Sequence, residues 1–169
     1  MDTLIDDWHC GITGKGSPRW EVVAGELRQT GSGTFPWCIK KGAALGDGFV
    51  EVKMKPISGR EDQAGGVVWR FKDGDNYYVA RANALEGNVS LYYTEGGWRK
   101  TIKYVDAPVA REAWHTLRVE FKATRIRVIL DGVTRIEVDD THIDGPGGVG
   151  VWTKADSVTS FDAFTFGTK

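Results

Sequence analysis

The sequence predicts an all-β fold, a two-sheet antiparallel β-sandwich of jelly-roll type. Apolar and polar residues alternate along about a dozen short segments, which is the period of a strand with one solvated face. Turn residues recur between these segments, and no window of about eleven residues shows the period of a capped amphipathic helix. The 22 Gly, seven Trp, seven Phe and five Tyr residues also suit short strands joined by tight turns.

The clearest strand covers residues 49–56, where Val50, Val52 and Met54 alternate with Glu51 and lysines. A period of two places the three apolar side chains on one face. The same alternation recurs at 117–122 and 125–130, and a shorter stretch of it follows at 136–138. The short links at 123–124 and 131–132 favour hairpins, so these three segments predict a meander.

Further strands are expected on both sides of this meander, separated by Gly- and Asp-rich turns. They cover residues 20–23, 26–29, 66–71, 76–82, 88–94, 98–104, 148–153 and 161–166. In 66–71 we expect Val67, Trp69 and Phe71 to point into the core and Arg70 to point out.

Length and charge limit the classes of protein that fit. The 169 residues suffice for one domain, 1–169, and carry 22 Lys plus Arg against 23 Asp plus Glu. This balance excludes a strongly basic nucleic-acid binder. No apolar run approaches the ~18 residues of a membrane helix, so no membrane insertion is expected. The start lacks the features of a signal peptide; the protein is either cytoplasmic, or secreted or periplasmic with a leader removed.

Two cysteines, Cys10 and Cys38, leave two alternatives open. They form a single disulfide in an oxidising compartment, or they are two small buried apolar side chains. Their spacing does not suit a CxxC redox or zinc pair. The three histidines, His9, His115 and His142, lack the spacing that brings two imidazoles onto one metal ion.

Several segments resemble the concanavalin A-like lectin/glucanase superfamily. They are 62–99 (DQAGGVVWRFKDGDNYYVARANALEGNVSLYYTEGGWR), 114–121 (WHTLRVEF), 149–164 (VGVWTKADSVTSFDAF) and 8–22 (WHCGITGKGSPRWEV). The resemblance is greatest to laminin-G-like bacterial proteins grouped with the 3-keto-disaccharide hydrolase domain and family 16 glycoside hydrolases. It implies a curved jelly roll whose concave sheet receives a sugar, sometimes with a structural calcium ion. The superfamily contains lectins, hydrolases and protein-binding domains on one scaffold, so the resemblance indicates fold more than activity.

The family 16 motif requires a second carboxyl group that this chain lacks at the matching position, although a pair assembled from separate strands stays open. Retaining hydrolysis uses two carboxyl groups ~5 Å apart. The nearest match to the family motif is Glu137 and Asp139, with His142 where the acid/base should stand. We therefore expect Glu137 and Asp139 to lie on a solvated face and assign no catalytic residue.

A sugar site combines aromatic rings with polar side chains that hydrogen-bond hydroxyl groups. Strand alternation places several such side chains on one outward face, and neighbouring loops add more. In 77–81 the alternation leaves open whether Tyr78 or Arg81 faces outward. The candidate ligand-binding residues are Arg70, Tyr78, Arg81, Asn83, Glu86, Tyr92, Trp98, Trp152 and Lys154.

Three acidic residues near the chain ends, Asp6, Asp7 and Asp162, converge if the first and last strands pair. With backbone carbonyls they are the candidate ligands of a structural calcium ion. No other cofactor is expected.

The sequence thus favours a non-catalytic, lectin-like domain that binds a poly- or oligosaccharide on its concave sheet. The alternatives are a glycoside-acting hydrolase of the 3-keto-disaccharide hydrolase kind and a protein-interaction module. The oligomeric state and the identity of the sugar stay open.

Overall fold

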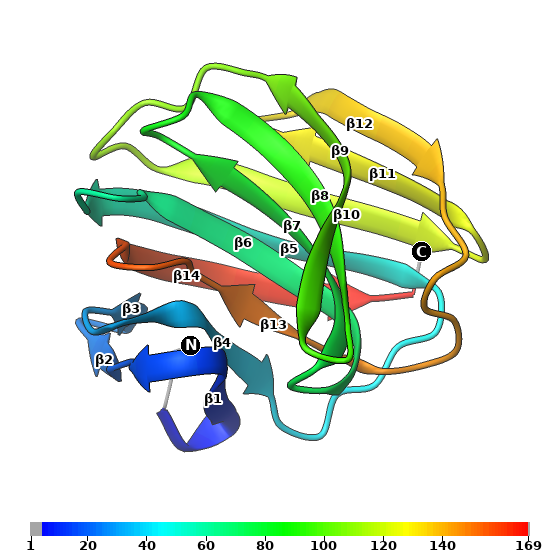
Figure 1. The fold of residues 1–169 in the computed structure, drawn as a ribbon, viewed down its shortest axis with the longest axis horizontal. Helices are drawn as coiled ribbons and strands as arrows, with labels where there is room; N and C mark the ends of the chain where they lie inside the picture. Colours follow the sequence, from blue (N-terminus) through cyan, green and yellow to red (C-terminus); the bar gives the residue numbers. More distant parts are fainter. Residues whose placement is uncertain (1–4, 169) are drawn as a thin grey trace.

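The computed structural model describes residues 5–168 and shows two seven-stranded antiparallel sheets packed face to face (Figure 1). Sheet A runs in the order β1 (Trp8–Ser17), β4 (Ser32–Lys40), β13 (Gly148–Trp152), β6 (Ala64–Asp73), β7 (Asn76–Asn83), β8 (Asn88–Glu95) and β9 (Trp98–Asp106). Sheet B runs in the order β12 (Val133–Asp139), β11 (Arg125–Leu130), β10 (His115–Lys122), β5 (Gly48–Ser58), β14 (Val158–Gly167), β3 (Glu26–Gln29) and β2 (Trp20–Val23). A short 3-10 turn, η1 (Ile5–Asp7), precedes β1.

Sheet B follows the alternation read from the sequence. Val50, Val52 and Met54 on β5 are fully buried in the cluster between the sheets. Strands β10, β11 and β12 form the expected meander, with β10 and β11 joined at 123–124. Buried and solvent-facing side chains alternate along each of these strands, as the sequence predicted. The predicted meander is therefore confirmed.

Sheet A buries side chains on both faces. Its inner face contributes Val67, Trp69 and Leu91 to the cluster between the sheets. Its outer face carries a second apolar cluster that is equally buried. The central strands β6, β7 and β8 are therefore buried along most of their length.

Two irregularities in sheet A change the direction of side chains. In β6 the pairing with β7 shifts after Trp69, where Arg70 has a φ of 48°. Because a bulge reverses the alternation beyond it, Phe71 packs against the outer cluster and not the core, contrary to the expectation. A second shift in β9, opposite Leu91 and Tyr92, has the same kind of effect.

Strands β1 and β4 were not predicted from alternation because Gly11, Gly14, Gly16, Gly33 and Pro36 interrupt it. They pair with Cys10 directly opposite Cys38, and the two residues form a disulfide. The first of the two alternatives for the cysteines is therefore the one that the structure shows.

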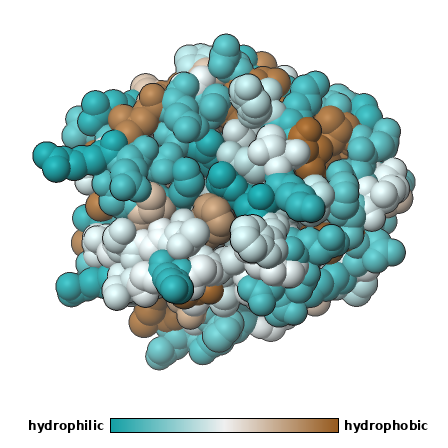
Figure 2. All heavy atoms as spheres, viewed as in Figure 1, coloured by the Kyte–Doolittle hydropathy of each residue, from teal (hydrophilic) through white to brown (hydrophobic). Residues whose placement is uncertain are grey.

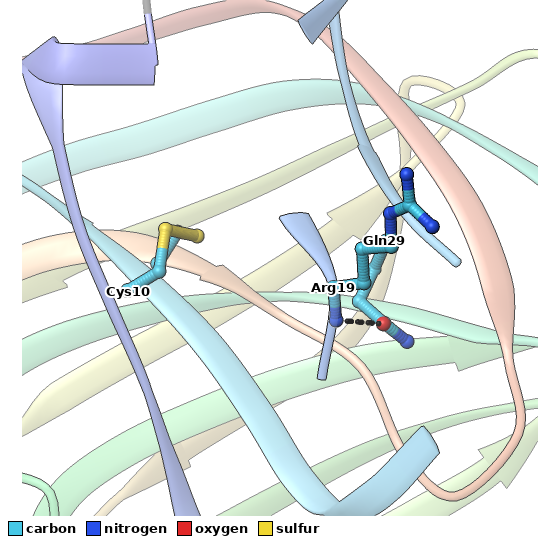
Figure 3. The surroundings of a disulfide bond; sticks show 4 residues. Cys10, Arg19 and Gln29 are labelled. Atoms are coloured by element: carbon cyan, nitrogen blue, oxygen red, sulfur yellow. Dashed lines mark hydrogen bonds between the residues drawn. A yellow bond between two sulfur atoms is a disulfide. The ribbon is translucent and has the colours of Figure 1, made fainter. Parts of the chain in front are cut away.

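Close to this disulfide, the buried side chain of Gln29 connects three segments (Figure 3). Its Oε1 accepts a hydrogen bond from the backbone N–H of Arg19 at 3.0 Å. Its Nε2 donates to the carbonyls of Gly31 and Ser157, each at 3.0 Å. Within residues 5–168 no helix is long and apolar enough to cross a membrane.

We expect replacement of both cysteines (Cys10→Ser with Cys38→Ser) to lower the free energy of unfolding by about 3 kcal/mol, because the bridge restricts the unfolded chain. Urea unfolding with and without a reductant measures this. The reductant should destabilise the natural sequence and leave the double variant unchanged. Equal stability of both proteins without reductant would contradict a stabilising bridge.

Candidate ligand-binding site on the outer face of sheet A

The outer face of sheet A is concave. Arg99 on β9 lies with its guanidinium carbon 4.8 Å from the ring centre of Phe35 on β4, although four strands separate β4 from β9. This contact requires the sheet to coil, and the β8–β9 hairpin passes in front of the neighbouring strands (Figure 1).

One part of this concave face is filled by apolar side chains. The cluster contains Trp37, Ile39, Ala64, Val68, Tyr77, Val79, Tyr92 and Trp152, with Phe35 and Phe71 packed against it. Thr13 anchors it through its hydroxyl, which lies 2.8 Å from the Tyr77 hydroxyl and accepts from Trp37 Nε1 at 3.1 Å. This part of the face is a second core rather than an open surface.

A stack of rings and a guanidinium group crosses the concave face. The rings of Trp152 and Phe35 lie 5.3 Å apart at 21°. The guanidinium of Arg99 lies over Phe35 on one side and 4.0 Å from the ring centre of Tyr92 on the other. Cation–π contacts of this kind hold the cation in place without neutralising it.

Next to this stack, on the same concave face, lies a polar region centred on Arg81. The Arg81 side chain is 3% exposed. Nε donates to the Tyr92 hydroxyl at 3.0 Å, and Nη2 donates to Glu86 Oε2 at 2.7 Å. On the two neighbouring strands, Arg81 is paired with small residues, Gly66 on β6 and Ser90 on β8. A Cβ on Gly66 would come within 2.6 Å of the Ala80 carbonyl, so glycine is needed beside Arg81.

A second ion pair lies beside the first. Asp62 is buried and accepts from Asn83 Nδ2 at 2.8 Å, while its other oxygen lies 3.1 Å from Lys154 Nζ. We call the whole group the arginine site. It consists of Asp62, Arg81, Asn83, Glu86, Tyr92, Arg99 and Lys154.

Local hydrogen bonds explain why these loops carry the site. Asn83 Oδ1 accepts from the backbone N–H groups of Leu85 and Glu86 at 2.9 and 3.3 Å, which shapes the β7–β8 turn. The carboxylate of Asp156 accepts from the backbone N–H groups of Arg60, Glu61 and Asp62, at 2.7 to 3.3 Å. These bonds place Glu86 and Asp62 at the same end of sheet A.

The charges of the arginine site are coupled. The hydrogen bond from Arg81 lowers the pKa of Glu86 and outweighs its partial burial. Burial opposes the charged form of Arg81, but Tyr92 and Glu86 outweigh it and the pKa of Arg81 is raised. Burial, with repulsion from Arg81, lowers the pKa of Arg99. Glu86 is therefore an acceptor at neutral pH and not a proton donor.

Three cations and two carboxylates give the arginine site a net positive charge. In the described part of the chain, Nη1 of Arg81 and Nη1 of Arg99 are buried without a hydrogen-bond acceptor. The accessible side chains are Glu86 (45% exposed) and Lys154 (28% exposed). Lys154 and Phe35 also line a shallow depression of about 400 Å³. Glu86 and Lys154 thus offer a fixed acceptor and a fixed donor at the mouth of the site, which suits the hydroxyl groups of a polyhydroxyl ligand.

Residues 2–164 match the family model of the 3-keto-alpha-glucoside-1,2-lyase-like domain. The chain belongs to this family. Comparison with curated proteins finds no match.

Solved structures share the fold of this lyase-like domain. Carbohydrate binding module CBM66 from Bacillus subtilis superposes with a TM-score of 0.83 at 19% identity, covering 96% of each chain. A Bacillus licheniformis beta-glucanase gives 0.67 at 16% identity, covering 96% of this chain and 92% of its own. A lichenase from a mouse hindgut metagenome gives 0.70 at 16% identity, covering 96% and 93%. The predicted jelly-roll fold is confirmed.

Five of the nine predicted ligand-binding residues come together in the arginine site. They are Arg81, Asn83, Glu86, Tyr92 and Lys154. Trp152 shares the concave face as the alternation indicated, but it is 0% exposed and cannot receive a sugar ring. Tyr92 is also buried, so the prediction of an open aromatic platform formed by these two rings was wrong.

Arg70, Tyr78 and Trp98 lie elsewhere. The bulge turns Arg70 to the end of the sandwich, where it donates to the carbonyls of Gly46, Ile143 and Ala123. Tyr78 lies between the sheets and its hydroxyl donates to Asp140 at 2.6 Å, so Arg81 is the outward residue of that strand. Trp98 pairs with Glu95, which alternates with the concave-facing Thr94. Trp98 therefore faces the other side of the sheet.

The acidic residues assigned to calcium do not form a site. Asp7 lies 3.8 Å from Lys40, and Asp162 accepts from the backbone N–H of Ala163 on β14. Asp6 lines a different depression, beside Trp8 and Trp20. Among residues 5–168 no three His, Cys, Asp or Glu side chains could hold a metal ion together. Asp6, Asp7 and Asp162 are therefore not arranged as the ligands of one calcium ion. Calcium binding itself stays an untested prediction.

Glu137 and Asp139 lie on β12 of sheet B, away from the concave face. Arg125 contacts them at 2.7 and 3.3 Å in an exposed ion-pair network. The expectation of a solvated face is confirmed.

Sequence reasoning did not assign Asp62 and Arg99 to the arginine site, and it did not identify Phe35 as the ring beneath Arg99. Asp62 precedes its strand, and Phe35 lies in the unpredicted β4. Arg99 was detectable in principle, because it follows Trp98 in a predicted strand and so faces the opposite side.

Trp152→Ala is expected to lower the free energy of unfolding by about 3–5 kcal/mol, because it leaves a cavity in the second core. The matched control is Trp98→Ala, which removes a 76% exposed ring and should change stability by less than about 0.5 kcal/mol. Chemical denaturation of both variants checks this. A stable, folded Trp152→Ala protein would show that the ring does not support the concave face.

Proposed function

We propose that this chain is a non-catalytic carbohydrate-binding domain whose arginine site holds one unit of a poly- or oligosaccharide. The observation that carries the proposal is Arg81, a buried cation held rigidly by Tyr92 and Glu86 on an outward-facing sheet surface. A buried ion pair contributes little to stability, because desolvation offsets the attraction. A binding role accounts for it better than a structural role.

The chemistry of the arginine site supports a sugar ligand. A sugar presents neighbouring hydroxyl groups that both donate and accept hydrogen bonds. Glu86 accepts and Lys154 donates at the accessible mouth of the site, and each is held by a buried partner, Arg81 or Asp62, before a ligand arrives. Such preorganisation reduces the entropy lost on binding.

The comparisons support the same class of ligand. The family is named after an enzyme that acts on a glucoside, and the similar structures include a carbohydrate-binding module and two glucanases. The Cys10–Cys38 bridge favours a secreted or periplasmic location, where disulfides persist and polysaccharides are met.

A protein-interaction role is less well supported by the viewed face. Its apolar cluster is buried, and the surface in Figure 2 is mostly hydrophilic or intermediate, with separate small hydrophobic patches. A protein-binding surface is expected to expose a contiguous apolar patch.

A glycan panel with the purified domain tests the proposal. We expect Glu86→Ala and Arg81→Lys to weaken saccharide binding at least about tenfold, because each removes a charged hydrogen bond. Arg125→Ala is the matched control, since it removes an arginine from the ion pairs of sheet B. Circular dichroism shows whether the variants stay folded. Unchanged affinity in folded Glu86→Ala would overturn the proposal.

A second candidate function is cleavage of a keto-glucoside, which the family match favours. Asp62 and Glu86 are the carboxylates of the arginine site, but Arg81 holds the pKa of Glu86 low and so opposes a role as general acid. We expect a 3-keto-α-glucoside incubated with the domain to be recovered intact by NMR. Cleavage that is lost in Asp62→Asn and kept in Arg125→Ala would replace binding with catalysis.

A further inference from the structure

Tyr104 on β9 is the second most exposed of the large apolar side chains in the described chain. It is 65% exposed, and β9 is the edge strand of sheet A beside the arginine site. Exposed aromatic rings next to a polar site are common at binding surfaces, since the ring supplies contact area at low entropic cost.

The strand register places Tyr104 on the concave face. Gly66 pairs with Arg81, Arg81 with Ser90, and Ser90 with Tyr104. Directly paired residues of antiparallel strands project to the same side of a sheet. Tyr104 therefore shares the face of Arg81, with the small residue Ser90 between them.

A bulge in β9 gives Tyr104 this direction. Ile102 and Val105 both pack against the cluster between the sheets, although they are three residues apart. Regular alternation would place them on opposite faces. The register shift opposite Leu91 and Tyr92 absorbs the extra residue, so Tyr104 faces outward while Ile102 and Val105 both pack against the cluster between the sheets.

We propose that Tyr104 is a stacking platform for a second sugar unit of the chain whose first unit lies in the arginine site. This inference rests on the proposed function and extends it to the length and direction of the ligand. Two strand spacings separate Arg81 from Tyr104, a distance of about 10 Å. A ligand that reaches from Glu86, the exposed partner of Arg81, to Tyr104 must therefore be longer than one sugar ring.

The surroundings of Tyr104 suit the face and hydroxyls of a sugar. Its ring is open to solvent, and the concave-facing Thr101 of the same strand is also exposed. As an edge strand, β9 presents backbone N–H and C=O groups that no neighbouring strand of sheet A uses. A saccharide running from Glu86 across β8 to β9 would meet both a ring and hydrogen-bonding groups.

The test compares chain lengths. The probes are α-gluco- and mixed-linkage β-gluco-oligosaccharides, from monosaccharide to hexasaccharide, measured by calorimetry. Tyr104→Ala should lower the affinity for the longer chains about tenfold, the size of one aromatic stacking contact, and leave the monosaccharide affinity unchanged. Tyr104→Phe should keep the affinity of the natural sequence. Trp98→Ala removes the other exposed ring of β9, on the opposite face, and should change nothing.

The outcomes separate this inference from the proposed function. If chains bind no more tightly than monosaccharides, or if Tyr104→Ala matches Trp98→Ala, the platform is overturned while the arginine site stands. A loss with Glu86→Ala at every chain length, together with a loss with Tyr104→Ala restricted to longer chains, supports both. A natural sequence that binds no member of the panel overturns both.

Discussion

Sheet A must bury side chains on both of its faces, and the arrangement of the concave site depends on this constraint. The inner face packs against sheet B in the usual way of a sandwich. Within residues 5–168, no third layer of structure covers the outer face. Instead, the sheet coils until its edge strand β9 lies over part of its own outer face, with Arg99 over Phe35 of β4.

Coiling divides the concave face into two parts with different roles. The rings of Trp37, Tyr77 and Trp152 fill one part and are removed from water. Their burial contributes to stability in the same way as the main core, since apolar area removed from water counts equally wherever it lies. The charged residues are confined to the end where the β7–β8 turn and the segment around Lys154 meet.

In the proposed binding mode, the site recognises a ligand through charged hydrogen bonds more than through ring stacking. Tyr92 is covered on its face by Arg99 and bonded at its hydroxyl by Arg81, so it orients the two guanidinium groups. Among exposed side chains, Tyr104 is the aromatic ring that the register leaves beside them. An arrangement of this kind separates a rigid, buried inner site from a solvent-exposed platform.

Strand alternation predicted the faces of most side chains correctly and failed at bulges. It placed Tyr92 and Trp152 on the concave face and left the choice between Tyr78 and Arg81 open, but it did not detect the shift at Arg70. A bulge depends on how two strands pair, and one strand's pattern does not reveal its partner. Alternation also does not distinguish an outward side chain from an exposed one, which is why Trp152 was mistaken for a platform.

The amino-acid sequence by itself determined the jelly roll, the meander of sheet B and most of the polar residues of the site. These follow from the two-residue period and from turn residues, both of which are local properties of the chain. Only the tertiary structure decided which outward residues are accessible and which join one another. The reason is that Asp62 and Arg99 reach the site, and Phe35 reaches Arg99, from strands and loops far apart in sequence, through a curvature that belongs to the whole sheet.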